Sequence, residues 1–503
     1  MNKKLILTLI VLASILFFFK LGSFSLYDAA ETTYGEFIKQ IRLTGDWVTM
    51  HYNGEIVFDK PPLYFWLATL ATYIFGFNEF ALRFWAALCG VLTVAATYFL
   101  GKSFYDQRVG WLAGIIALTS FQFLIQSRIA ELDILLTLLI TLTFLFFWLG
   151  YQSNNSKYYL VCYAAAGLAT LVKGLLGIAL PGFAIFLFLL FRGGVPRLKE
   201  IKIIPGALIL LTIATPWYAA EWFLHGQRFT EFVLGFLFLS RFQGVVAGHP
   251  GPWYYYLLAL ILGFAPWSHF LPLALTRTWK NRVGQVELLS LCYIVPVIFV
   301  FSIAQTKLPN YMLPLYPFLA IMVAKLWDDI LSESANKLRG PFMLSNLAFA
   351  GVVAMIIIGF ALLGTANYAG QYEELMPNLL VLATILGIGA LCSAICALWS
   401  KFKMSFYAIP IMVFALAFVL TTQTLPAVEK YKGTKELAQE VTQNIKENQT
   451  IAAYNTGNRP GIVFYSSKPV VYLKNEQEFK TFLKEKKGYV FTTDDKENLV
   501  LLR

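Results

Sequence analysis

Long apolar runs recur along most of the chain, separated by short polar segments. A run of about 20 apolar residues crosses a bilayer as a helix, because a helix satisfies its own backbone hydrogen bonds in lipid. Hydropathy indicates about thirteen such spans, near residues 5–22, 79–101, 108–128, 131–152, 158–174, 175–192, 203–224, 252–275, 286–304, 311–329, 341–364, 377–399 and 402–425. The pattern therefore predicts an all-α polytopic membrane protein.

Two stretches near the start of the chain depart from the pattern of spans. Residues 63–76 (LYFWLATLATYIFG) are apolar but short, so we expect a re-entrant or interfacial helix there. Residues 35–54 (GEFIKQIRLTGDWVTMHYNG) place apolar side chains among charges at helical spacing. This spacing predicts an amphipathic helix that lies on the membrane surface.

The composition changes near residue 427, where charged and mixed sequence replaces the apolar runs. A helical pattern comes first, near residues 433–446, followed by the β-like runs IAAY, GIVFY and PVVYL. A helix rich in Lys and Glu follows near residues 475–487, and a further strand, GYVFTT, comes after it. These segments predict a small soluble α/β domain.

We therefore expect two domains. A transmembrane domain comprises residues 1–426 and includes a juxtamembrane loop at residues 23–62, and a soluble α/β domain comprises residues 427–503. The first apolar run follows Lys3 and Lys4 and has no convincing small-residue cleavage site. We interpret it as a retained first helix.

The distribution of charge predicts the orientation. If the N-terminus is cytoplasmic, the cytoplasmic loops carry Lys102 and Arg108; Lys157; Arg192, Arg197, Lys199 and Lys202; Arg277, Lys280 and Arg282; Lys337 and Arg339; Lys401 and Lys403. The opposite loop at residues 365–376 has two glutamates and no base. The positive-inside rule then places the loop 23–62, the loop 225–251 and the C-terminal segment outside a cell (inner) membrane, in the periplasm or extracellular space.

Overall composition supports this class of protein. The 503 residues are 58% hydrophobic and 14% charged, with a mean hydropathy of +0.63, which excludes a soluble globular protein of this size. The net charge of +11 belongs to the cytoplasmic loops and does not indicate a nucleic-acid partner. The five cysteines lie in apolar segments without metal-ligand spacing, so we interpret them as packing residues.

Ionisable residues gather where the predicted spans reach the outer face: Asp28, Glu31, Asp59, Lys60, Arg128, Glu131, Asp133, Lys173, Arg241, His249 and Lys307. Any single one is as well explained by a side chain that reaches for lipid headgroups. Charges at this depth are costly, however, and their collection from many segments at one face favours a shared functional site. A transporter would place such groups near the middle of the bilayer, in duplicated halves.

Six stretches of sequence point to a known family: YDAAETTYGEFIKQIRLTGDW, FDKPPLYFW, SRIAELDILLTL, LATLVKGLLGIALPG, HPGPWYYYLLALILGFAPW and TKLPNYMLPLYPFLAI. In their order and spacing, they resemble the GT-C glycosyltransferases of the protein O-mannosyltransferase and lipid A aminoarabinose transferase superfamily. The expected spans and outer C-terminal domain are similar to the same architecture.

The resemblance implies an inverting glycosyltransferase. It would take a sugar from a polyprenyl-phosphate carrier (undecaprenyl or similar) and transfer it to a hydroxyl or phosphate of lipid A, a protein or a surface glycan on the outer face of the membrane. The chain has no glycine-rich nucleotide-binding loop, which agrees with a lipid-linked donor. A transporter or flippase of lipid-linked sugars is the alternative from another class.

The resemblance also implies roles for individual residues. An acceptor hydroxyl needs a general base, and the family pattern puts this carboxylate in the first outer loop. The second acid of the family pattern matches Glu31, whereas the first is replaced by Ala30, and Asp28 stands two residues earlier. We expect Asp28 to be the base, with Glu31 as the next candidate.

A lipid phosphate that leaves with the developing charge needs cations around it. Lys60 and Lys173 match family lysines, Arg241 offers a guanidinium fork for phosphate, and Lys307 is a further candidate of this kind. The remaining candidates for the active-site cavity are Asp59, Asp133, Glu131 and Arg128. No cofactor is required, and a zinc ion bound by Asp59 and His249 is left open.

Overall fold

The computed structural model describes residues 3–193, 200–233, 250–332, 336–367, 375–485, 487–494 and 499–502. The described chain divides into two compact units. Unit 1 comprises Met1–Phe19, Ala86–Arg128 and Leu132–Thr422, and unit 2 comprises Lys20–Trp85, Ile129–Glu131 and Gln423–Arg503.

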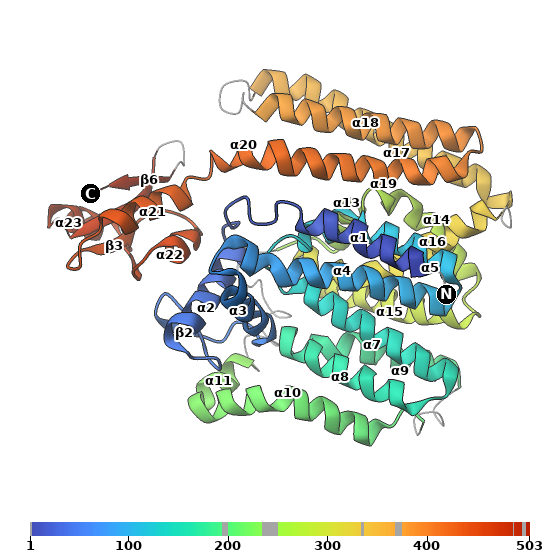
Figure 1. Cartoon of the computed structure of the whole chain (residues 1–503), viewed down its shortest axis with the longest axis horizontal. Helices are drawn as coiled ribbons and strands as arrows, with labels where there is room; N and C mark the ends of the chain where they lie inside the picture. The colour runs from blue at the N-terminus through green and yellow to red at the C-terminus, as the bar shows by residue number, and fades with distance from the viewer. Residues whose placement is uncertain are drawn as a thin grey trace. The chain divides into compact units, whose positions relative to one another are not determined.

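Unit 1 is built from helices (Figure 1). They are α1 (Lys3–Phe18), α4 (Glu79–Phe104, whose first residues belong to unit 2), α5 (Gln107–Leu118), α6 (Phe121–Gln126), α7 (Asp133–Ser153), α8 (Ser156–Lys173), α9 (Leu176–Phe191), α10 (Ile203–His225), α11 (Gln227–Glu231), α13 (Tyr255–Gly263), η3 (Trp267–Phe270), α14 (Leu271–Lys280), α15 (Gln285–Ile303), η4 (Pro309–Leu315), α16 (Tyr316–Leu331), η5 (Asn336–Leu338), α17 (Arg339–Asn367), α18 (Met376–Leu398), α19 (Phe402–Val419) and η7 (Leu420–Thr424). Helices α17, α18 and α19 pack side by side, as do α7, α8 and α9.

The prediction of a multi-pass helical membrane protein is confirmed. Among the described residues, seven helices are long and apolar enough to cross a membrane: Glu79–Phe104, Asp133–Ser153, Ile203–His225, Gln285–Ile303, Arg339–Gly359, Met376–Leu398 and Phe402–Glu429. The pair Tyr255–Gly263 and Trp267–Lys280 meets at 116° and would be an eighth span if counted as one. The other expected spans coincide with shorter or broken helices. The stretch 108–128, for example, is interrupted at Thr119 and Ser120 between α5 and α6.

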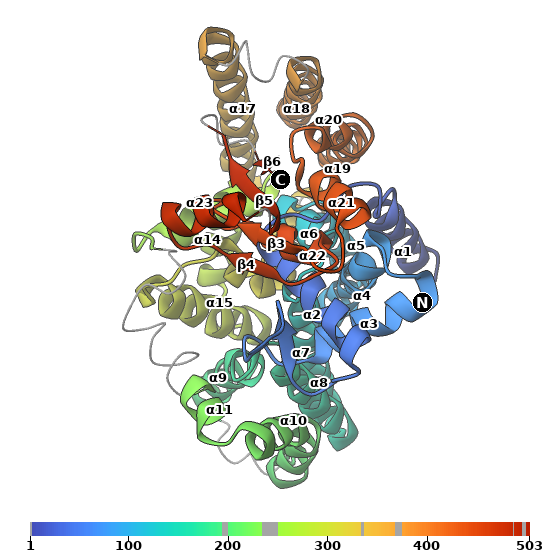
Figure 2. The ribbon, with the colours of Figure 1, turned by 90° about the vertical axis from the view of Figure 1, so that its left-hand side faces the viewer.

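Unit 2 holds the remaining elements: α2 (Ala30–Thr44), β1 (Met50–Tyr52), β2 (Glu55–Val57), α3 (Leu63–Phe75), α20 (Leu425–Glu429), α21 (Thr434–Asn444), β3 (Thr450–Ala453), α22 (Gly461–Tyr465), β4 (Val470–Tyr472), α23 (Glu476–Lys484), β5 (Gly488–Thr493) and β6 (Leu499–Leu502). The four strands of the C-terminal segment form one sheet in the order β4-β3-β5-β6 (Figure 2). β4 and β5 both run parallel to β3, and β6 runs antiparallel to β5.

The sheet is covered by helices on both faces. Ala438 and Val441 of α21 and Ile462 and Val463 of α22 pack against Ile451 on one face. On the other face, Phe482 of α23 packs against Ala452 and Val490. The alternation of inward and outward side chains along β3 and β5 gives each helix layer its own apolar surface.

One predicted strand of this segment is wrong. The run GIVFY forms the helical turn α22, which follows Pro460 directly. Proline fixes its own φ in the helical range and suits the start of a helix, and here its φ is −64°. The turn buries Ile462, Val463 and Phe464 together.

The predicted helix over residues 35–54 also needs correction. α2 begins at Ala30 and ends at Thr44, where Gly45 takes the left-handed conformation that terminates many helices. β1 and β2 follow as a hairpin, and its turn at Asn53 and Gly54 has φ values of 52° and 84°, as a tight β-hairpin requires.

Most of the apolar face of α2 is covered by protein, although Leu43 near its end is exposed. Phe37, Ile38 and Ile41 are buried, and Phe37 packs edge-on against Phe65 of α3, with ring centres 5.3 Å apart. The predicted helix over residues 63–76 is observed as α3.

Close packing between α4 and α5 leads to a first prediction. A Cβ at Gly110 would lie 2.5 Å from the Tyr98 carbonyl oxygen and 2.9 Å from the Lys102 nitrogen, both of them backbone atoms. We expect Gly110→Ala to push the helices apart and to destabilise the protein by about 1–3 kcal/mol. The measurement is the thermal unfolding midpoint of the purified protein in detergent.

The matched control is Gly351→Ala in α17, where a Cβ meets nothing within 4 Å. This variant should melt at or slightly above the wild-type temperature, since alanine favours a helix more than glycine does. Equal melting of the two variants would contradict the packing argument.

Candidate active site

The carboxylate of Glu31 is buried at the start of α2, with 1% of the side chain exposed. It accepts hydrogen bonds from the backbone nitrogens of Tyr27 and Ala130, and from Nε and Nη2 of Arg83 at 2.8 Å each. The pair with Arg83 is therefore bidentate, which is the strongest geometry for a carboxylate and a guanidinium.

Arg83 is fully buried, and all five of its N–H groups have acceptors. Besides Glu31, they donate to the carbonyls of Leu21, Phe24 and Ser25 at 2.9–3.1 Å. The guanidinium carbon also lies 4.1 Å from the centre of the Phe24 ring. The chain from residue 21 to 25 thus wraps around one cation.

Sequence reasoning did not select Arg83. The signal was present, because an arginine inside the predicted span 79–101 needs a buried partner. What the sequence does not show is that the partner is Glu31, which lies on another helix.

Asp28 has a different environment. The residue is exposed as a whole, but its carboxylate accepts hydrogen bonds from the Gly461 nitrogen at 2.8 Å and from Thr434 Oγ1 at 3.3 Å. Partial burial raises the pKa of Asp28 above its ordinary value, although both hydrogen bonds and the charges of Arg459 and Lys432 oppose this shift. A carboxylate whose pKa is raised is a stronger base than a carboxylate with the ordinary pKa.

Asp59 and Lys60 form an ion pair just before α3. Lys60 Nζ lies 2.6 Å from Asp59 Oδ1, and 13% of the lysine side chain is exposed. Pro61 and Pro62 follow and fix the backbone ahead of α3. The lysine is therefore held near the start of a helix by a neighbouring acid.

A second polar group lies within unit 1. Asp133 is the first residue of α7 and Lys173 is the last of α8, so the antiparallel pair of helices brings both to the same end. Lys173 Nζ donates to Asp133 Oδ1, and Asn310 Nδ2 donates to Asp133 Oδ2 at 2.7 Å. Lys173 also lies 4.9 Å from the centre of the Tyr311 ring. This is a nearly buried cation with an acid, an amide and an aromatic face around it.

Two other candidate cations stabilise helix ends. Arg128 donates to the carbonyls of Leu16, Phe17 and Phe19 at the end of α1. Lys307 donates to three carbonyls at the end of α15, those of Phe301, Ser302 and Ala304. An ammonium has three hydrogens, so a phosphate at Lys307 would have to replace one of these bonds.

The structure says less about the remaining candidate residues. Glu131 is partly buried and follows Ala130, whose nitrogen binds Glu31. Arg241 and His249 lie outside the described residues. Within the described ranges, no three His, Cys, Asp or Glu side chains are grouped as a metal site would need, so the structure gives the zinc alternative no support.

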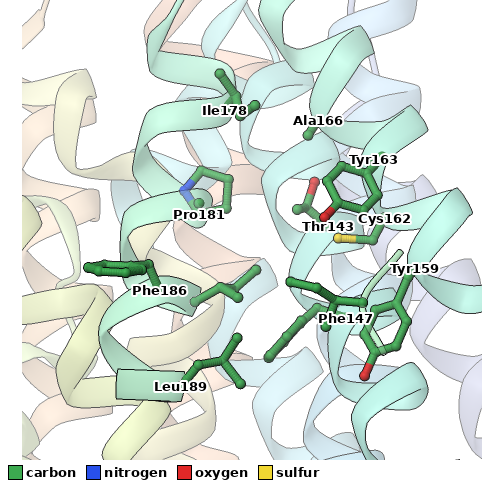
Figure 3. A pocket seen from close by; sticks show the side chains of 13 residues that line it. Thr143, Phe147, Tyr159, Cys162, Tyr163, Ala166, Ile178, Pro181, Phe186 and Leu189 are labelled. Atoms are coloured by element: carbon green, nitrogen blue, oxygen red, sulfur yellow. The ribbon is translucent and has the colours of Figure 1, made fainter. Parts of the chain in front are cut away.

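Two cavities in unit 1 are apolar. One of about 150 Å³ lies between α7, α8 and α9, where Thr143, Phe147, Tyr159 and Pro181 are among the lining side chains (Figure 3). Another of about 500 Å³ is lined mainly by α17, α18, α19 and the bend after α13. Neither is lined by a candidate residue named above.

Comparison with known proteins finds glycosyltransferases among the relatives of this chain. Residues 59–219 match the family model described as dolichyl-phosphate-mannose-protein mannosyltransferase. The chain is 30% identical over 392 residues to an undecaprenyl phosphate-α-4-amino-4-deoxy-L-arabinose arabinosyl transferase of Yersinia enterocolitica, which covers 74% of this chain and 68% of that one. It is 28% identical over 477 residues to the protein of the same name from Edwardsiella ictaluri, covering 93% and 85%.

Solved structures share the fold. ArnT from Cupriavidus metallidurans, solved with bound undecaprenyl phosphate, superposes with a TM-score of 0.80 at 19% identity, over 99% of this chain and 94% of ArnT. An oligosaccharyltransferase of Archaeoglobus fulgidus superposes with a TM-score of 0.57 at 14% identity, over 98% and 70%.

The helical membrane fold and these relatives together define a membrane-embedded glycosyltransferase that takes its sugar from a lipid-phosphate carrier. The chain belongs to the family of undecaprenyl phosphate-α-4-amino-4-deoxy-L-arabinose arabinosyl transferases, within the GT-C superfamily that the sequence motifs indicated. This result favours the transferase over the transporter alternative.

The buried ion pair leads to a second prediction. Glu31→Gln leaves the Arg83 charge buried without its counter-charge, which costs about 3–5 kcal/mol in comparable cases. We expect a markedly lower thermal unfolding midpoint in detergent, whereas Glu55→Gln, an exposed acid of the β1–β2 hairpin, should melt like the wild type. The double variant Glu31→Leu/Arg83→Met should recover part of the loss, and full stability of Glu31→Gln would contradict a structural role.

Proposed function

We propose that this protein transfers an aminopentose of the 4-amino-4-deoxy-L-arabinose type from undecaprenyl phosphate to lipid A, with inversion, at the outer face of the inner membrane. The observation that carries the proposal is the similarity to arabinosyl transferases over 93% of the chain in one relative and 74% in another. The mannosyltransferase family model over residues 59–219 makes mannose transfer to a protein the second candidate.

The membrane arrangement belongs to the proposal. The N-terminus would be cytoplasmic, about thirteen spans would follow as the hydropathy indicates, and the α/β segment 427–503 would be a domain outside the membrane. Support comes from the bases in alternate loops and from the helices that coincide with each expected span, whole or broken.

For the general base we propose Asp28 and not Glu31. The carboxylate of the buried Glu31 already accepts four hydrogen bonds, two from Arg83 and two from backbone nitrogens. Moving Glu31 toward a substrate would break its ion pair with Arg83. Asp28 makes two hydrogen bonds and retains lone pairs for the proton of an acceptor hydroxyl. Its raised pKa brings it closer to the pH at which it would work.

In the proposed step, Asp28 takes the proton from the acceptor hydroxyl while the oxygen of that hydroxyl bonds to the anomeric carbon of the sugar. The bond from that carbon to the phosphate oxygen breaks on the opposite face, and the carrier phosphate leaves as an anion. Lys60 in unit 2 is the proposed cation for this charge, and Lys173 in unit 1 and Arg241 remain candidates from the sequence. Asp59 pairs with Lys60, and Asp133 pairs with Lys173.

Asp28→Asn gives the third prediction. With wild-type protein, labelled undecaprenyl-phosphate sugars and lipid A, we expect labelled lipid A by mass spectrometry, and at least about 100-fold less with Asp28→Asn. Glu55→Gln serves as the matched control in the same loop and should keep its rate. Undiminished transfer by Asp28→Asn would overturn the choice of base. Transfer of labelled mannose to an added protein acceptor, with no sugar transferred to lipid A, would favour the second candidate.

Lys60 gives the fourth prediction. Removal of a charge-assisted contact to phosphate weakens binding by about 1.5–3 kcal/mol, so Lys60→Met should raise the Kd for a fluorescent polyprenyl phosphate at least about tenfold. Lys484→Met, at the exposed end of α23, controls for the loss of a lysine and should bind normally. Equal affinity of Lys60→Met and wild type would exclude Lys60 from the phosphate site.

A further inference from the structure

The helical turn α22 of the C-terminal segment is held at both ends by the first loop of the chain. At its start, the Gly461 nitrogen donates to Asp28 Oδ1 at 2.8 Å. At its end, Lys39 Nζ of α2 donates to the carbonyls of Phe464 and Ser466 at 2.9 and 2.8 Å. An acid and a base of one loop therefore bind the two ends of a single turn.

The approach is close enough to require glycine on both sides. A Cβ at Gly461 would collide with Asp28 Oδ1, and a Cβ at Gly35 of α2 would lie 2.8 Å from the Phe464 ring. Neither glycine has a positive φ, so the requirement arises from contact and not from backbone conformation.

Further hydrogen bonds join the same two segments on either side of Asp28. Before it, the Ser25 nitrogen donates to Glu429 Oε1 at 2.9 Å and the Leu26 nitrogen to the Tyr465 hydroxyl at 2.8 Å. After it, the Asn53 side chain exchanges two bonds of 2.8 Å with the backbone of Val470 in β4. These bonds, far apart in sequence, restrict the loop along its length.

We propose that the C-terminal segment is a positioning element of the transfer site, in which α22 and Thr434 hold the Asp28 carboxylate in its working place. The proposal rests on the proposed function, because it takes Asp28 as the base. It differs from a tail that only selects the acceptor, since the segment would be needed for transfer to any acceptor.

The surroundings of Asp28 give this role a measurable signature. The groups that face its carboxylate are the Gly461 nitrogen, the Thr434 hydroxyl and the charges of Arg459 and Lys432, all from the C-terminal segment, and the hydroxyl of Tyr52 from the hairpin. The Thr434 hydrogen bond lowers the pKa of Asp28 against the effect of burial. Its removal should therefore raise this pKa further.

The test is the pH dependence of kcat/KM for sugar transfer by the full-length protein. A base acts only when it is deprotonated, so activity falls as the pH drops through its pKa. We expect Thr434→Val to move the midpoint of this acidic limb upward, because the variant loses a hydrogen bond that lowers the pKa of Asp28. Thr434→Ser should restore the wild-type midpoint, whereas a general loss of structure would lower the rate without moving it.

Thr442→Val is the matched control, because Thr442 lies on the same helix and its hydroxyl donates to the Ala438 carbonyl within that helix. It should leave the profile unchanged. An unmoved midpoint in an active Thr434→Val variant overturns the proposal.

Hydrogen exchange tests the contact between Asp28 and Gly461 separately from the role of Asp28 in sugar transfer. In the full-length protein, peptides that contain the Gly461 amide should exchange faster in Asp28→Ala, which removes the acceptor, than in wild type. Unchanged exchange overturns the contact itself. Faster exchange with full transfer by Asp28→Asn leaves the contact standing but overturns the proposed base, and the positioning role falls with it.

Discussion

The burial of one guanidinium determines the shape of the first loop. Arg83 lies inside the protein with every N–H group paired, and three of those groups take carbonyls from residues 21–25. A buried charge is tolerated only when its partners are complete, so the loop has little freedom to rearrange without exposing or orphaning this cation. The turn that leads into α2 and the residues around Asp28 are fixed as a result.

This constraint divides the acids of the loop by role. Glu31 provides the counter-charge and is surrounded by donors, while Asp28, three residues earlier, keeps an exposed position with donors from the C-terminal segment. Two carboxylates three residues apart thus have different hydrogen-bond partners, a buried guanidinium for Glu31 and the C-terminal segment for Asp28.

Much of the fold follows from the sequence because lipid leaves few choices: long apolar runs become helices, and most expected spans coincide with them. The α21, β3, β4, α23 and β5 segments also followed from local pattern. The sequence could not reveal contacts made by distant residues. Among these contacts are those of Arg128 and Lys307 with helix-end carbonyls, and Arg83 was overlooked because its partner lies on another helix. GIVFY has strand-forming residues, yet Pro460 and its buried contacts make it a helical turn.

The most direct measurement is an experimental structure of the protein with an undecaprenyl-phosphate sugar analogue and an acceptor analogue. The account predicts that Glu31 still binds Arg83 and that the Asp28 carboxylate lies within hydrogen-bonding reach of the acceptor oxygen, with Lys60 at the phosphate. A structure in which Glu31 leaves Arg83 to contact the acceptor, while Asp28 faces away from the substrates, would contradict it.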